Sequence, residues 1–145
     1  MRRIRVVVAD QAEARFFDTT DHGLTLTSAG ALQDPEGRLK EHDLVTDKPG
    51  SASGHGHYAL QPHGSRKEHD VGLFAKKIAD KLLAESNAGE FDDLALIAAP
   101  HFLGILRKAL PPVLHTKVRH EIVHDLVHQS EAVIRAHLPV SWPTP

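Results

Sequence analysis

A long amphipathic helix pattern followed closely by a buried strand pattern is the feature that most limits the folds open to this chain. Within residues 67–85, Phe74, Ile78 and Leu82 recur at steps of four, which is the spacing of one face of an α-helix. The apolar run 92–100 then ends in a proline and has the length of a buried strand. A helix that leads into such a strand is typical of a sheet with helices packed on its faces.

The first thirty residues predict three consecutive strands. Residues 3–9 form a β-branched run, residues 13–20 continue as a second strand, and residues 24–30 alternate apolar and polar side chains. Turn signals separate these strands at residues 10–11 and 21–23. Because consecutive strands with short connections usually pair, the chain is expected to open with an antiparallel meander.

The rest of the chain predicts two further helices and one ambiguous segment. Residues 101–110 read as a helix that a Pro-Pro pair stops, and residues 130–137 as a helix with Ser130 as its N-cap. Residues 117–128 fit both a helix and a strand period. A strand there would give the buried strand an outer neighbour. The predicted fold is then α/β: a ribonuclease-H-like mixed sheet, made of the three-stranded antiparallel meander plus two further strands, with helices on its faces.

Residues 46–65 are expected to be a flexible loop within a single domain of residues 1–145, after a short helix at 35–44. Gly, Ser, Pro and His dominate this loop and no periodicity survives. Its histidines are candidate ligands for zinc or another transition metal, and they are His55, His57 and His63. The alternative is a solvated loop and no cofactor.

Residues 120–124 match H-E-x-x-H, the pattern of many zinc proteases. On a helix, His120 and His124 would lie on one face about 6 Å apart and could share one zinc ion, with Glu121 as the base. On a strand the same residues span about 13 Å, too far for both rings to bind one ion at about 2 Å. The β-branched content and the missing outer strand favour the extended form, so no zinc site is expected here.

The carboxylates of Asp10 and Asp125 form a second candidate for metal chemistry. Both are expected at strand ends, and ribonuclease-H-like nucleases bind two magnesium ions through carboxylates on their central strands. The structural alternative is that Asp10 simply forms its turn or a cap.

A third candidate lies where the buried strand 92–100 ends and the next helix begins. Pro100, His101 and Gly104 lie at this helix N-terminus, where backbone N–H groups can bind a ligand, and Arg107 follows one turn later. Equally, Pro100 and Gly104 could serve chain geometry and close packing.

Charge and composition exclude several classes of function. The chain has 17 basic and 19 acidic residues, a net charge of −2, so neither sequence-specific DNA nor a membrane is expected as a partner. With no cysteine, disulfides, iron–sulfur clusters and cysteine-ligated zinc are excluded. Neither a signal-peptide pattern nor a membrane-length apolar run occurs. The cytoplasm of a bacterium is the expected location.

Six stretches spread along the chain resemble the bacterial host attachment protein family, small proteobacterial proteins described as required for attachment to host cells. They are VVVADQAEARFFD, DLVTDKPG, GHGHYA, FAKKIADKLL, FDDLALIAAPHFLGILRKAL and VHDLVHQS. Where the family usually has D-R-P-G-R, residues 47–51 here are DKPGS, and the family's Arg-His is Gly56-His57. The family is similar to the middle domain of archaeal and eukaryotic peptide-chain release factors. The resemblance therefore implies a release factor-like domain, although the G-G-Q tripeptide of those factors is absent.

The leading hypothesis is a non-enzymatic cytoplasmic binding protein of this family, with a ribosome or structured RNA as the first partner to test and an indirect effect on attachment to host cells. The candidate binding residues lie on or near the histidine-rich loop, the Asp10 turn and the helix that follows Pro100. They are Asp10, Arg15, Lys48, His57, Arg66, Lys67, His101 and Arg107. The alternative is a metal-dependent hydrolase or nuclease using His120/His124 or Asp10/Asp125. A loop that sequesters metal or senses pH is a third option. No oligomeric state is predicted.

Overall fold

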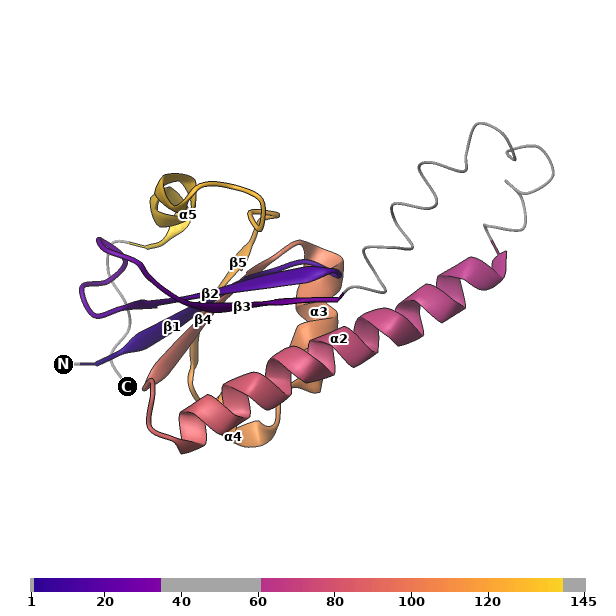
Figure 1. The fold of residues 1–145 in the computed structure, drawn as a ribbon, viewed down its shortest axis with the longest axis horizontal. Helices are drawn as coiled ribbons and strands as arrows, with labels where there is room; N and C mark the ends of the chain where they lie inside the picture. Colours follow the sequence, from indigo (N-terminus) through magenta and orange to yellow (C-terminus); the bar gives the residue numbers. More distant parts are fainter. Residues whose placement is uncertain (1, 35–60, 140–145) are drawn as a thin grey trace.

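Five strands form one mixed sheet in the order β3-β2-β1-β4-β5 (Figure 1). This computed structural model describes residues 2–34 and 61–139, and only the backbone of residues 61–67. The strands are β1 (Ile4–Ala9), β2 (Glu13–Thr19), β3 (Thr27–Gln33), β4 (Asp93–Ala98) and β5 (Val118–Val123). Strand β2 pairs antiparallel with β1 and with β3, whereas β4 pairs parallel with both β1 and β5. The predicted mixed α/β fold with a meander and two further strands is confirmed; its finer assignment as ribonuclease-H-like stays a prediction.

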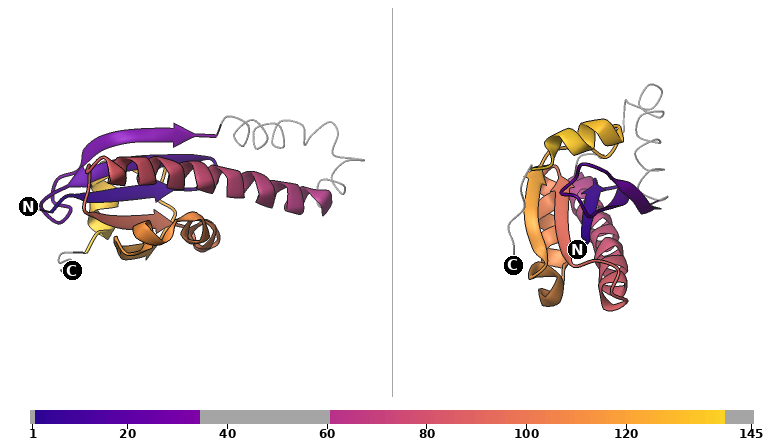
Figure 2. Two further views of the ribbon diagram at one scale, coloured as in Figure 1. Left: turned by 90° about the horizontal axis from the view of Figure 1, so that it is seen from below. Right: turned by 90° about the vertical axis from the view of Figure 1, so that its left-hand side faces the viewer.

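Helices cover both faces of this sheet. Figure 2 shows α5 on one side, and α2, α3 and α4 on the other. The helices are α2 (Gln61–Asn87), α3 (Pro100–Ala109), α4 (Pro112–His115) and α5 (Glu131–His137). The single turn α4 is not among the predicted elements. The predicted cap of α5 is confirmed, because the Ser130 side chain accepts a hydrogen bond from the Val133 N–H at 3.3 Å.

The central strands β1 and β4 are buried along their whole length, so alternate residues feed two separate apolar clusters. On the α2 and α3 side, Val7 and Leu96 pack with residues such as Phe74. On the α5 side, Val6 and Ile97 pack with Ile134 and its neighbours. This two-sided burial explains why both strands appear in the sequence as continuous apolar runs rather than as alternating patterns.

Among the described residues, two charged side chains are buried within these layers, and both are paired. Arg5, 1% exposed, forms ion pairs with Asp18 and Glu85, which join the sheet to the last turns of α2. Asp93, 3% exposed, accepts two hydrogen bonds from Arg2, at 2.7 and 2.9 Å, and lies 3.1 Å from the Arg119 Nε atom. These contacts link β1, β4 and β5 near the strand starts.

Helix α2 begins earlier than the sequence predicts. Its 27 residues correspond to a length of about 40 Å, and its first turns extend beyond the sheet (Figure 1). The predicted loop 46–65 is therefore wrong for residues 61–65, which are helical. Pro62 is compatible with this start because a proline in the first turn removes no intrahelical hydrogen bond. The remainder of that loop and the predicted helix 35–44 lie outside the described residues.

Two other elements differ from the prediction by more than two residues. Strand β3 begins at Thr27 rather than at Leu24. The preceding turn is longer than expected, with His22 and Gly23 at φ values of 60° and 88°, and the Thr19 hydroxyl accepts the Gly23 N–H. The ambiguous segment 117–128 is extended only over β5, and residues 124–130 then cross the sheet to reach α5 (Figure 1).

Both ends of the described chain lie near the edge where β1 begins. Arg2 precedes β1, and Leu138 follows α5 and packs against Gly23, where an added Cβ would come within 2.8 Å of its Cδ1 atom. No helix in residues 2–34 and 61–139 is long and apolar enough to cross a membrane.

Candidate functional site

The parallel strands β1, β4 and β5 end at the same side of the sheet, which is called here the carboxyl edge. It consists of the Asp10 turn after β1, the start of α3 after β4, and residues 124–130 after β5. Helix α2 connects β3 to β4 and runs back along the sheet, so its first turns also lie toward this edge (Figure 1). The topology thus brings together the elements that the sequence singled out. In folds with parallel strands, ligands commonly bind at this edge.

Asp10 forms the turn between β1 and β2. Its Oδ1 atom accepts hydrogen bonds from the Ala12 and Glu13 N–H groups, both at 2.8 Å, and its own N–H donates to the Glu13 carbonyl at 2.9 Å. Burial raises the pKa of the Asp10 carboxyl, and these backbone donors oppose the shift. The structural alternative for Asp10, a turn-forming aspartate, is therefore present in the molecule.

Asp10 also has titratable neighbours from the segment after β5, His128 and Asp125. The His128 ring places Nε2 3.6 Å from Asp10 Oδ2 and Nδ1 3.8 Å from a Glu13 carboxylate oxygen. Asp125 is near enough for its charge to contribute to the raised pKa of Asp10, and His128 acts in the opposite direction. The fold thus places Asp125 within electrostatic range of Asp10. Among the described residues, however, no group of three or more side chains could hold a metal ion.

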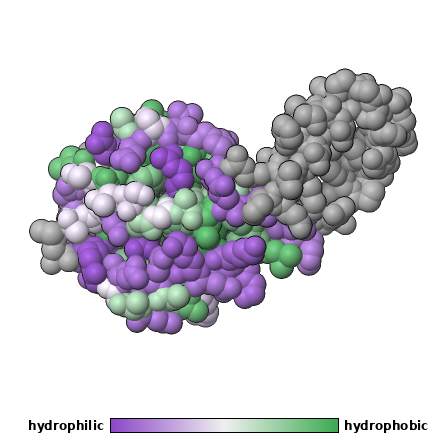
Figure 3. Space-filling view, in the orientation of Figure 1, coloured by the Kyte–Doolittle hydropathy of each residue, from purple (hydrophilic) through white to green (hydrophobic). Residues whose placement is uncertain are grey.

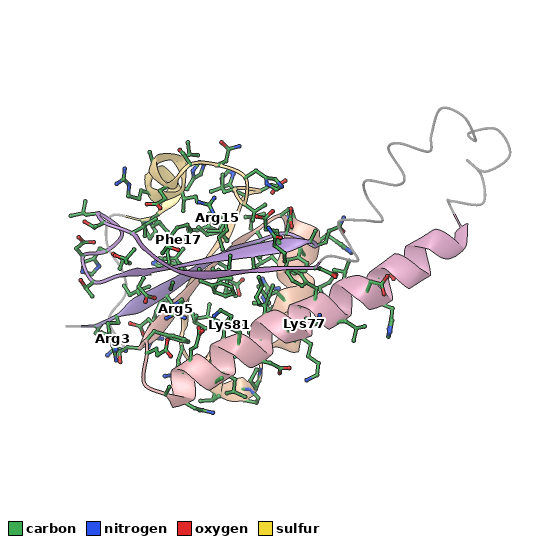
Figure 4. The ribbon with its side chains drawn as sticks, in the orientation of Figure 1. Arg3, Arg5, Arg15, Phe17, Lys77 and Lys81 are labelled. Atoms are coloured by element: carbon green, nitrogen blue, oxygen red, sulfur yellow. The ribbon has the colours of Figure 1, made fainter. Side chains whose placement is uncertain are left out.

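Arg15 on β2 secures the same segment. Its Nη1 atom donates to the carbonyls of Val127 and Gln129, at 3.0 and 2.7 Å, and its guanidinium lies over the Phe17 ring at 5.1 Å. Figure 4 shows Arg15 and Phe17 on the α5 side of the sheet. Arg15, a predicted phosphate contact, therefore uses part of its hydrogen-bonding capacity to hold residues 127–129 in place.

Arg107 on α3 pairs with Glu121 on β5. Its Nε and Nη2 atoms both donate to the Glu121 carboxylate, with 3.0 Å for the Nε contact. This two-point contact lowers the pKa of Glu121 and raises that of Arg107. Arg107 is thus engaged within the chain, and Glu121 is an ion-pair partner rather than a base beside a metal.

The H-E-x-x-H pattern does not make a zinc site. His120 and Glu121 lie on β5, and His124 follows its end, where its N–H donates to the Ala98 carbonyl at 3.1 Å. On a strand, residues this far apart in sequence cannot direct two rings at one ion. The expectation of an extended segment is confirmed. The zinc alternative that used His120 and His124 is wrong because the pattern needs a helix.

The start of α3 is open to solvent. His101 is exposed, in the first turn of the helix, behind Pro100. A Cβ atom added to Gly104 would meet nothing within 4 Å, so close packing does not explain this glycine. The first-turn N–H groups of α3 therefore remain a feature that a ligand could use.

Several predicted residues cannot be located. Lys48, His55 and His57 lie outside the described residues. His63, Arg66 and Lys67 belong to the first turns of α2, where the structure describes the backbone only. The proposed metal ligands of the loop therefore stay a prediction. For Arg66 and Lys67, the structure shows only that their backbone belongs to the part of α2 that extends toward the carboxyl edge.

Three residues of this region were not predicted from the sequence as part of the site. Glu13 and His128 flank Asp10, and His137 contacts His124 with ring centroids 4.5 Å apart. A local signal existed for Glu13, because an aspartate three residues earlier in the chain can accept its N–H in a turn. The histidine contacts depend on the path of residues 124–130 over the sheet, which no local pattern encodes.

Fold and site together define a mixed α/β protein with a five-stranded sheet and a polar carboxyl edge. The chain belongs to the family described as "Protein required for attachment to host cells", whose sequence model matches residues 5–138. A search among curated proteins finds no match.

Two archaeal structures are similar to this chain. The archaeal translation termination factor aRF1 is 13% identical, with a TM-score of 0.54 over 92% of this chain and 34% of its own. A structure described as an archaeal protein is 14% identical, with a TM-score of 0.39 over 94% of this chain and 36% of its own. The first similarity supports the fold, and the chain spans about a third of either structure's length.

Proposed function

We propose that this chain is a non-enzymatic cytoplasmic binding protein of the host attachment family, which acts through the carboxyl edge of its sheet. A ribosome or structured RNA is the proposed partner, and the effect on attachment to host cells is then indirect. The observation that carries the proposal is that the open N-terminus of α3 and the first turns of α2 are directed toward one edge. Helix N-termini favour phosphate groups, and a nearby pair of cations would strengthen that preference.

Two further observations support binding rather than catalysis. The fold is similar to that of an archaeal translation termination factor, and translation takes place on the ribosome. Among the described candidates, Asp10 and Arg107 have structural roles, in a turn and in an ion pair with Glu121. Because Arg15 is also engaged, the phosphate contacts are proposed at Lys48, Arg66 and Lys67.

Co-sedimentation with ribosomes at low and at moderate salt tests this proposal. The variant R66E/K67E changes the charge by −4 near the carboxyl edge. The control K108E/R135E makes the same change at exposed positions in the last turns of α3 and α5. Wild type and control should sediment with ribosomes, more strongly at low salt because phosphate contacts release counterions. The edge variant should lose most of this binding. Absence of wild-type binding at both salt concentrations would refute the ribosome proposal.

A magnesium-dependent nuclease is the second candidate, because the charge of Asp125 contributes to the raised pKa of Asp10. Magnesium-dependent cleavage of RNA or DNA by the wild type, lost in Asp10→Asn, would support it. Equal cleavage by wild type and variant would indicate a contaminating nuclease and remove this candidate.

A further inference from the structure

The rings of His124 and His137 are in contact although 13 positions separate them in the sequence. Their centroids are 4.5 Å apart and their planes are tilted by 61°. His124 directly follows β5, and His137 is the last residue of α5. The contact therefore joins the two ends of the segment that crosses the α5 face of the sheet.

The hydrogen bond of His137 indicates which tautomer its neutral ring adopts. Its Nδ1 atom lies 2.9 Å from the Val133 carbonyl oxygen, one turn earlier in α5. Because a carbonyl oxygen only accepts, Nδ1 carries the proton, and the neutral ring has its lone pair on Nε2. An Nδ1–H bonded to a carbonyl is the arrangement that orients histidine ligands in metal sites.

We propose that His124 and His137 together bind one divalent transition-metal ion. Two imidazoles in contact can both reach an ion at about 2.0–2.1 Å, which the extended geometry denies to His120 and His124. His124 is an exposed residue, so its ring can turn toward the ion by rapid rotamer exchange. Imidazole suits zinc, copper and nickel. Since the described residues provide no group of three ligands, water completes the coordination.

A bound ion would link the end of β5 to the end of α5. It would hold residues 124–130, which carry His128 and the carbonyls bound by Arg15, against the carboxyl edge. Metal binding would then stabilise the folded state in proportion to the logarithm of the free ion concentration. This site uses other residues than the predicted loop ligands His55, His57 and His63.

Calorimetric titration with Ni²⁺ tests the site in a chain with His55, His57 and His63 changed to alanine. This background should bind one equivalent and unfold at a higher temperature with Ni²⁺ than without it. His124→Phe and His137→Phe keep an aromatic contact but remove a ligand, so each should weaken Ni²⁺ binding at least tenfold. The control His115→Phe changes another exposed histidine and should bind as the background does.

The location of the ion provides an independent readout. Paramagnetic Ni²⁺ should broaden the NMR signals of residues around His124 and His137 first. Circular dichroism of the two phenylalanine variants should match the background, which separates loss of a ligand from loss of fold. Affinity unchanged by either substitution, broadening centred elsewhere, or no binding in the background would each overturn the proposal.

Discussion

Asp93 shows how strongly a single buried carboxylate can couple parts of this protein. It is nearly fully buried and lies against Arg2 and Arg119, which come from either side of β4. The hydrogen bonds and charge of Arg2 are the main reason that the pKa of Asp93 lies below its usual range, and Arg119 adds to the effect. Removal of its charge would leave two arginines without their buried partner.

The substitution Asp93→Asn should lower the free energy of unfolding by about 2–4 kcal/mol at pH 7. Because the pKa of Asp93 is lower in the folded state than in the unfolded state, its ionised carboxylate stabilises the folded state at pH values above the unfolded pKa. This stabilisation is lost as the pH falls toward the folded pKa. The difference between wild type and variant should therefore shrink below about pH 4. Urea unfolding of both proteins at several pH values measures this difference in the free energy of unfolding.

Asp92→Asn is the matched control for this prediction. Asp92 is half-buried, and its carboxylate lies 4.0 Å from the Arg3 side chain, a contact worth less than about 1 kcal/mol. Equal losses of stability in the two variants would contradict the role given to Asp93.

Asp10 should behave in the opposite way. Burial raises its pKa, so the folded state favours the protonated form, and the unfolding free energy falls as the pH rises above the usual pKa of 3.8. Asp10→Asn retains an oxygen for the Ala12 and Glu13 N–H groups and removes the charge. It should be at least as stable as wild type at pH 7, with the difference vanishing near pH 3.

Asp10→Ala separates the turn from the charge. It removes the acceptor of two backbone N–H groups and should cost about 1–2 kcal/mol. Urea denaturation of both variants at pH 7 measures the two effects. A strongly destabilised Asp10→Asn would mean that the carboxylate charge itself is required.

At the scale of elements, the β2–β3 turn and the end of α5 depend on each other. Gly23 has a φ of 88°, and an added Cβ would meet Leu138 at 2.8 and 3.2 Å. Gly23→Ala should therefore cost about 2–3 kcal/mol, from backbone strain and from a steric clash. Gly89→Ala, at a φ of 76° with open space around it, carries the strain alone and should cost about 1 kcal/mol.

Thermal unfolding of these two glycine variants measures the difference. Equal destabilisation would show that Leu138 moves away without cost. It would also show that the end of α5 is not held firmly against the turn.

Most elements were predictable because they depend on local patterns. The β-branched run of β1, the period of α2 and the cap of α5 by Ser130 each carry their own signal. The first turns of α2 were missed because Gly64 and Pro62 resemble a loop in composition. At the site, the sequence indicated Asp10 and Asp125, but the pairing of Arg107 with Glu121 and of His124 with His137 depends on tertiary packing.

For the whole molecule, the layered arrangement predicts a graded stability. Strands β1 and β4 are buried on both faces, whereas β3 is an exposed edge strand and α5 has only seven residues. Helix α2 also has a solvent-facing side, which is largely hydrophilic in Figure 3. Hydrogen exchange should therefore be slowest in β1 and β4 and fastest in β3 and α5.

Exchange followed by mass spectrometry measures this order. Protection of β3 equal to that of β1 would contradict it and would indicate that another chain or segment pairs with the β3 edge.

The positions of Arg2 and Leu138, both opposite the carboxyl edge, have a practical consequence. A bead or sensor surface coupled through a linker near either of these two residues would hold the molecule by its far side. The candidate surface would then face the bulk solution, so capture experiments could sample it without obstruction by the support.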